Sequence, residues 1–136
     1  MEKVVMQTSH TATGFCCICK QLPGWVVTGS KDFGKFKDYV QESIDLFIQC
    51  AKEEGDEYPS IFDGEYEVVY DMDACALLSY YQKVISFAGL QTLSGINQRQ
   101  LAHYVAGRSN PRPQQAEKIK QAFALLAQDI MKEYKN

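Results

Sequence analysis

Residues 90–111, LQTLSGINQRQLAHYVAGRSNP, decide how the C-terminal half of this chain folds. Leu90 and Leu93 give the first part of the stretch an apolar side. Gly95 stands where a helix must stop and reverse, because glycine accepts the positive φ that such a stop usually requires. Asn97 is a residue type that commonly caps the start of a helix. The stretch therefore predicts two short helices joined by a tight turn.

The second of these helices has one apolar and one polar side. Leu101, Tyr104 and Val105 recur at three- and four-residue spacing, so we expect them to face inward behind Ile96, which fills the turn. Gly107 should end the helix. The other side is left with long amide and basic groups, namely Gln98, Arg99, Gln100 and His103. This pattern is typical of a helix-turn-helix, which places its second helix in the DNA major groove.

The exposed face of the second helix favours DNA over simple packing. Any helical hairpin needs a glycine and some leucines, and packing alone is the alternative interpretation. An ordinary surface helix, however, tends to carry Glu and Lys, whereas no acid lies between Asn97 and Gly107. Arginine pairs with guanine through two hydrogen bonds, and glutamine pairs with adenine in the same way.

The charges of the chain are divided unevenly along its length. Residues 1–74 contain 14 acids and 6 bases, a net charge of −8, and residues 75–136 contain 3 acids and 8 bases, a net charge of +5. The overall charge of −3 therefore conceals two opposite halves. A basic half suits a polyphosphate such as DNA, and an acidic half suits a basic partner.

The composition is that of a globular protein, with 46% hydrophobic and 23% charged residues. No run approaches the roughly 18 apolar residues of a membrane span, and residues 1–6 contain no signal-peptide core. Five cysteines without a secretory signal lead us to expect reduced thiols and a cytoplasmic location.

Two of the cysteines, Cys16 and Cys19, form a C-x-x-C pair. A zinc site needs four ligands, but the chain has no second such pair, and its only histidines are His10 and His103. The run 15–19 is typical of a buried strand, in which cysteine behaves as a small hydrophobe. We therefore expect neither a metal nor a cofactor.

The first half of the chain alternates β-type runs with turns. Strands are predicted over 3–7, 15–20 and 25–28, where β-branched and aromatic residues are bounded by Gly and Pro. A helix should follow and end at Gly55, and a fourth strand is predicted over 66–70. The helix packs one side on the sheet through Phe33, Phe36, Val40, Ile44, Phe47 and Ala51.

The second half of the chain is predicted to be helical throughout. Asp73 can cap a helix whose apolar side is Leu77, Leu78, Tyr81, Val84 and Ile85. Pro113 suits the first position of a last helix, whose stripe is Ala116, Ile119, Phe123, Leu126, Ile130 and Tyr134. We therefore predict an α+β chain with domains 1–72 and 73–136. The stripe 119–134 is a candidate for dimerisation, with burial against its own domain as the alternative.

Two of these regions together resemble the HicB-like antitoxins of bacterial toxin–antitoxin modules. One is the order of two strands, residues 22–25 (LPGW), a strand, residues 28–30 (TGS) and a helix. The other is the C-terminal segment, which resembles the Cro/phage-repressor type of helix-turn-helix, including its G-x-x-N-P ending at 107–111. The chain departs from that family at 32–35 (DFGK), where a Glu-Glu-Ala run is usual, and at Gln91, where alanine is usual.

The resemblance implies a partial RNase H-like N-terminal domain of β-β-β-α-β order without nuclease activity. It implies that this domain binds a small RNA-cleaving HicA-like toxin, and that the C-terminal domain represses the operon by binding operator DNA. Helix-turn-helix domains read paired half-sites, so we expect a homodimer or a higher homo-oligomer. Base contacts would fall to Gln98, Arg99 and His103 on the helix that also carries Gln100. Asn97, Arg108 and Arg112 would suit phosphates.

Two other classes of protein compete with this interpretation. A nuclease would need several carboxylates around a divalent metal, but the predicted strands within 3–28 carry none, and Asp38, Glu42 and Asp45 lie on the polar side of a helix. His10 sits in a predicted polar loop, so no Ser/His/Asp set forms and we expect no enzyme. The other class is a stand-alone regulator whose N-terminal domain senses a ligand or dimerises.

Overall fold

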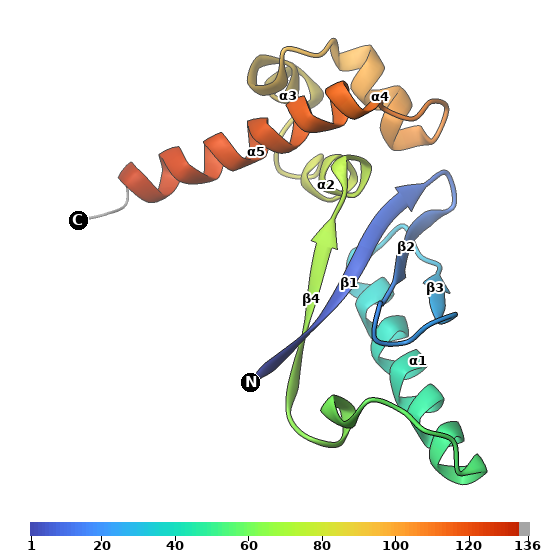
Figure 1. Ribbon diagram of the computed structural model, residues 1–136. Helices are drawn as coiled ribbons and strands as arrows, with labels where there is room; N and C mark the ends of the chain where they lie inside the picture. The colour runs from blue at the N-terminus through green and yellow to red at the C-terminus, as the bar shows by residue number, and fades with distance from the viewer. Residues whose placement is uncertain (134–136) are drawn as a thin grey trace. The chain divides into compact units, whose positions relative to one another are not determined.

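The protein has an α+β fold, which its computed structural model describes for residues 1–133. Within that range lie a four-stranded sheet and five α-helices (Figure 1). The chain divides into two compact units. The first holds residues 1–9 and 13–71, and the second holds residues 10–12 together with the chain from Met72 onward. The sheet and the first helix belong to the first unit, and the remaining four helices belong to the second.

The sheet has the strand order β3-β2-β1-β4. Strands β1 (Glu2–Thr11) and β2 (Gly14–Ile18) are joined by a short turn, and β3 (Val26–Thr28) runs antiparallel to β2. Strand β4 (Tyr66–Met72) follows a short 3-10 turn at Ser60–Asp63 and runs in the same direction as β1 (Figure 1), so the sheet is mixed. The register of the antiparallel pair places Cys16 opposite Thr28, Cys17 opposite Val27 and Ile18 opposite Val26.

Helix α1 (Phe33–Glu54) connects β3 to the segment before β4. Its first turn is capped by Asp32, whose carboxylate accepts the Lys35 backbone N–H at 3.2 Å. It ends at Gly55, which adopts a left-handed φ of 72°. One face of the helix is buried along its whole length, through Phe33, Phe36, Val40, Ile44, Ile48 and Ala51.

Two expectations for α1 and for strand β1 were wrong. Phe47 was expected in the buried stripe of α1, but it is 38% exposed and its neighbour Ile48 is 8% exposed. Both residues fall within the apolar arc of the helix, which spans more than 100°, and the packing partners decide between them. His10 was expected in a polar loop, but β1 continues to Thr11, and strand alternation turns His10 inward beside Thr8.

The second unit is built from helices α2 (Ala74–Tyr81), α3 (Phe87–Ser94), α4 (Gln98–Ala106) and α5 (Pro113–Glu133). Asp73 caps α2 by accepting the Ala76 backbone N–H at 2.9 Å. The helices share one apolar core, in which Ile96 fills the turn between α3 and α4. Its buried members are Ala74, Cys75, Leu78, Leu90, Ile96, Leu101, Tyr104 and Ile119.

Three expectations for the second unit need correction or fall outside the structure. Val84 was expected on the apolar side of the helix after Asp73, but α2 ends at Tyr81 and Val84 is 76% exposed. Residues 82–85 form the connection between the two helices, because Ser86 already caps the start of α3. Leu93 was expected to face inward and is exposed, which leaves Leu90 as the anchor of α3. Tyr134 lies outside the described residues.

None of the helices in residues 1–133 combines the length and the apolar content that crossing a bilayer requires.

Candidate nucleic-acid interface

The turn between α3 and α4 is fixed by backbone geometry and by caps. Ser86 starts α3 by accepting the Gly89 backbone N–H at 3.0 Å. Gly95 ends α3 with a φ of 75°, and its N–H donates to the carbonyl of Gln91 at 2.8 Å. A residue with a side chain adopts that conformation only at a cost. The sequence expectation that Gly95 stops the first helix is confirmed.

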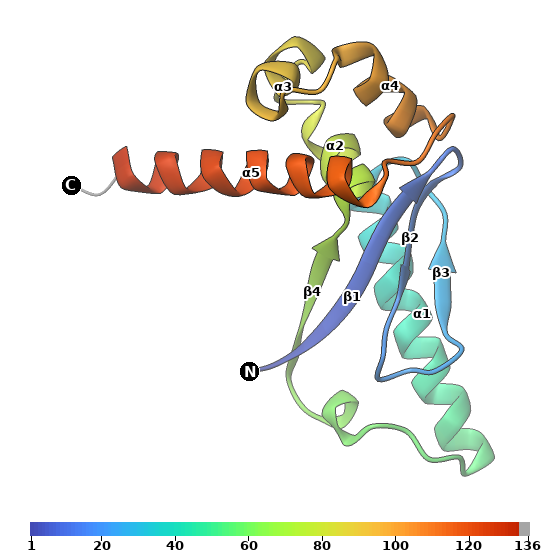
Figure 2. The same cartoon turned by 45° about the horizontal axis from the view of Figure 1, so that its top comes forward.

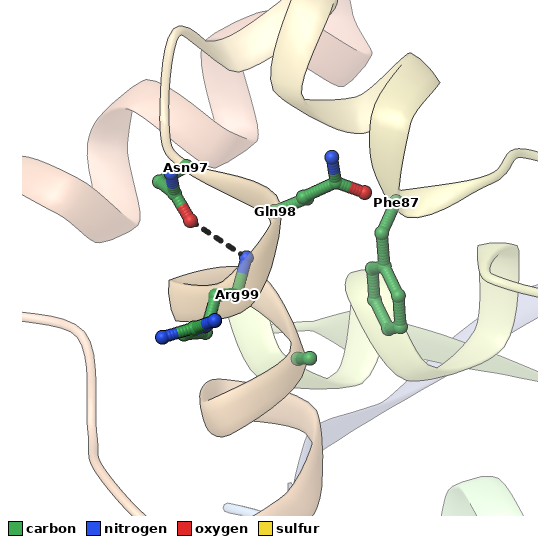
Figure 3. Close-up of a pocket in the computed structure, with 5 residues that line it drawn as sticks. Phe87, Asn97, Gln98 and Arg99 are labelled. Carbon is green, nitrogen blue, oxygen red and sulfur yellow. Dashed lines mark hydrogen bonds between the residues drawn. The ribbon is translucent and has the colours of Figure 1, made fainter.

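Two side chains hold the first turn of α4. The Asn97 side-chain oxygen accepts the Arg99 backbone N–H at 2.8 Å, the bond that Figure 3 marks. The Gln91 side-chain oxygen, one helix earlier, accepts the Gln98 backbone N–H at 2.8 Å. The first N–H groups of a helix have no partner within the helix, so these two bonds satisfy donors that would otherwise face water. The Gln91 bond also ties α3 directly to the start of α4.

The side chains at the start of α4 surround an open hollow of about 580 Å³, lined by Phe87, Asn97, Gln98, Arg99 and Ala102. In Figure 3 the Gln98 side chain reaches toward Phe87, whereas the Arg99 side chain extends away from it. Asn97, Gln98 and Arg99 are all exposed. The structure thus brings together three of the residues that the sequence singled out, at the end of α4 that carries the positive end of the helix dipole.

The other predicted contact residues lie further along the chain. His103 stands one turn after Arg99 on the same side of α4 and is half-buried. Gln100 points elsewhere, because its side-chain nitrogen donates to the Ser109 hydroxyl at 3.2 Å and so braces the loop after α4. Gly107 ends α4 with a φ of 76°, and exposed Arg108 and Arg112 follow in that loop.

Sequence reasoning missed three contributors to this surface. Gln91 had been noted only as a departure from alanine, and its bond across the turn could not be inferred from a spacing of seven residues. Phe87 and Ala102 line the hollow, but an aromatic residue at a helix start and an alanine within a helix give no signal by themselves. The short side chain of Ala102 leaves the backbone of α4 open to close approach by a ligand.

The electrostatics around the hollow favour an anion. No Asp or Glu occurs between Asp73 and Glu117, and the bases in that interval are Lys83, Arg99, Arg108 and Arg112. The N-terminal end of a helix adds a partial positive charge to such a surface. A phosphate backbone approaching α4 therefore meets donors and positive charge without a competing carboxylate from this interval.

Three of the five cysteines, Cys17, Cys19 and Cys75, are buried and take part in packing. Burial raises the pKa of the Cys17 thiol to about 12 and the pKa of the Cys75 thiol to about 11, so both stay protonated at neutral pH. In the C-x-x-C pair, the Cys16 sulfur lies 2.9 Å from the Ser9 hydroxyl, and the Cys19 thiol donates to the Gln21 side-chain oxygen at 3.3 Å. Among the described residues, no three His, Cys, Asp or Glu side chains are grouped to hold a metal ion.

Comparison with protein-family models, with curated protein sequences and with solved structures finds no match to this chain.

Proposed function

We propose that the chain is a HicB-like antitoxin whose helical unit binds operator DNA through a helix-turn-helix formed by α3 and α4. One observation carries this proposal. Asn97 and Gln91 hold the start of α4 rigidly through its backbone, while the side chains of Gln98 and Arg99 stay free of that support and exposed. Rigid helix placement with unengaged amide and guanidinium groups is what base recognition in the major groove requires.

The proposal gives each polar residue of this surface a role. Gln98 and Arg99 would read base edges near the start of α4, with His103 one turn further along. Asn97, Arg108 and Arg112 would contact phosphates and so set the register of the helix on the duplex. Gln100 supports the loop that carries Arg108, because its amide is engaged with Ser109.

The first unit is proposed to be the partial RNase H-like domain that neutralises a toxin. The strand order β3-β2-β1-β4, with α1 inserted before β4, supports this assignment. The net charge of −8 over residues 1–74 suits a basic, RNA-binding partner, because complementary charge speeds association and selects among partners. In this account the first unit blocks the toxin by covering its RNA-binding face and catalyses no reaction.

A gel-shift assay with the duplex upstream of the chain's own gene tests the DNA proposal. Arg99→Ala should lower specific affinity by about 1–3 kcal/mol and relax sequence preference, because it removes a base contact. Arg112→Ala should weaken binding to all sequences alike, because it removes a phosphate contact. Lys118→Ala, an exposed base within α5, is the matched control and should bind normally. Unchanged operator binding by Arg99→Ala would remove the base-contact assignment.

Co-purification tests the antitoxin part separately. The full chain, expressed with the reading frame next to its own gene, should pull down a short basic protein and suppress its RNA cleavage. A chain that binds DNA but retains no such protein would be a stand-alone regulator. The first unit would then have to sense a ligand or dimerise.

A further inference from the structure

Helix α5 is longer than the core that it packs against. Its 21 residues correspond to a rod of about 32 Å, yet only Ile119 and Ala122, both in its first half, are buried. Phe123 packs partly against the core of the second unit. Beyond this point the helix extends away from α2, α3 and α4, as Figures 1 and 2 both show.

The extended part of α5 leaves several large apolar side chains exposed. Residues 124–131, ALLAQDIM, contain six apolar residues among eight. The side chains of Leu125, Ile130 and Met131 are 56%, 47% and 70% exposed. Successive residues of a helix are about 100° apart, so Leu125 and Met131 flank opposite edges of the face that Leu126 and Ile130 continue from the core. Exposed apolar side chains that lie close together on a folded surface often mark a site that another protein covers.

We propose that this segment, residues 124–133, is covered by helix α5 of a second copy of the chain, with the two helices antiparallel. The charges along α5 favour this arrangement. Residues 117–121 carry a net charge of +1 and residues 128–133 a net charge of −1. An antiparallel pair brings opposite signs together, for example Lys120 of one copy and Glu133 of the other, whereas a parallel pair would align like charges.

A two-fold axis near Leu126 also buries the exposed apolar side chains of α5 between the two copies. The contact is isologous, so Ile130 of each copy meets the part of the stripe around Phe123 of the other copy. The contact draws on about one half of a single helix from each copy, fewer than the roughly 20–30 residues a side of a standard interface, so the dimer is weak and concentration-dependent. A further step rests on the proposed DNA binding. An operator with two half-sites would strengthen the dimer, because it binds the helical units of both copies at once.

Sedimentation equilibrium of the full chain tests the proposal. The chain should form a reversible dimer with a micromolar dissociation constant. Ile130→Lys should weaken it at least about tenfold, because each dimer then buries two unpaired charges. Val84→Lys is the control, since Val84 is another exposed apolar residue of the second unit that lies outside α5. Both variants should keep the far-ultraviolet circular dichroism and melting curve of the parent chain. Met131→Lys, at the edge of the same segment, should also weaken the dimer.

The outcomes for the dimer and for DNA binding can be told apart. A chain that stays monomeric at all concentrations, or a dimer that Ile130→Lys and Met131→Lys leave intact, overturns the α5 interface, whether or not DNA is bound. Protection of residues 124–133 from hydrogen exchange only when the toxin protein is added overturns it in favour of a different partner. A dimer broken by Ile130→Lys in a chain that binds no DNA leaves the interface standing and removes the proposed function.

Discussion

The two long helices of this protein have almost the same length and very different surroundings. Helix α1, with 22 residues, buries six of them at regular intervals from its first turn to its last. Helix α5, with 21 residues, buries two, both in its first half. Both helices have an apolar stripe of helical period, so the stripe alone does not tell how much of a helix its own domain will cover.

What differs between the helices is the extent of the partner surface. The first unit covers α1 along its length, from Phe33 in the first turn to Ala51 in the last. Near that end Lys52 also forms an ion pair of 3.6 Å with Asp63, in the segment before β4. Within the second unit, the short helices α2 and α3 pack against α5, and α5 extends beyond them (Figure 2). We therefore propose an intermolecular role for the apolar residues in the second half of α5, whereas the stripe of α1 serves the core of its own unit.

The largest effect is expected in the core under α1. Phe36 is fully buried, and its ring centroid lies 5.8 Å from that of Phe15 and 6.4 Å from that of Tyr70. Phe36→Ala should lower the free energy of unfolding of the first unit by about 3–5 kcal/mol, because it opens a cavity. Urea unfolding followed by the fluorescence of Trp25, the only tryptophan, measures this directly. Phe47→Ala, on the exposed edge of the same helix, should cost much less, and equal losses would contradict the burial assigned to α1.

A similar pair within α5 separates its two halves. Ile119 is fully buried in the core of the second unit, so Ile119→Ala should destabilise that unit by about 2–5 kcal/mol. Ile130→Ala should leave the stability of the dilute monomer nearly unchanged. Hydrogen exchange of the α2–α5 backbone amides resolves the two cases. A large loss from Ile130→Ala in the monomer would mean that the second half of α5 is covered by its own chain.

A smaller effect is expected at Asp73, which caps α2. Burial raises the pKa of its carboxyl above the ordinary value, while hydrogen bonds from the Ala76 and Cys75 backbones and the charge of Lys120 oppose the rise. The folded state therefore holds the proton more tightly than the unfolded state, and the contribution of this group to stability falls as pH rises between the ordinary pKa and the raised one.

Two substitutions separate the cap from the charge. Asp73→Ala should cost about 1 kcal/mol at neutral pH, because the cap is lost. Asp73→Asn keeps an oxygen for the Ala76 N–H and removes the charge, so it should be at least as stable as the parent chain at neutral pH and should flatten the pH dependence. Thermal melts between pH 3 and pH 7 check both variants. A strong loss in the asparagine variant would show that the charge itself stabilises the helix.

The smallest effect on stability is expected at Gln91. Gln91→Ala removes one exposed hydrogen bond, worth about 0.5 kcal/mol, and loosens the start of α4 from α3. Operator affinity should fall although no DNA-contacting residue is changed. Gln91→Glu retains the acceptor and should melt like the parent chain. Full operator binding by Gln91→Ala would show that Asn97 alone positions α4.

The parts of the fold that depend on neighbouring residues could be predicted from the sequence. Asp73 and Asn97 cap helices with side chains that reach their own backbone, and Gly55, Gly95 and Gly107 end helices because each takes a positive φ. Every one of these roles was predicted from residue type and position. Such interactions span four residues or fewer, so the chain carries the information locally.

The features that depend on distant partners could not be predicted. Phe47 and Ile48 are equally eligible for the buried face of α1, and the surface packed against the helix chooses Ile48. At the candidate site, Gln100 was grouped with the exposed contact residues, but its bond to Ser109 depends on how the loop after α4 folds back. The hydrogen bond from the Gln98 N–H to Gln91 likewise exists only because α3 and α4 pack together.

The function that we propose for the helical unit is binding of a DNA duplex through the exposed start of α4. Fluorescence anisotropy of the full chain, with a labelled duplex from upstream of its own gene at increasing salt, measures this most directly. The affinity should fall linearly on logarithmic axes, with a slope of about −0.9 for each phosphate that is neutralised. Removing Arg112 should reduce the slope by about one contact. No binding at low salt, or an affinity that does not change with salt, would contradict the account.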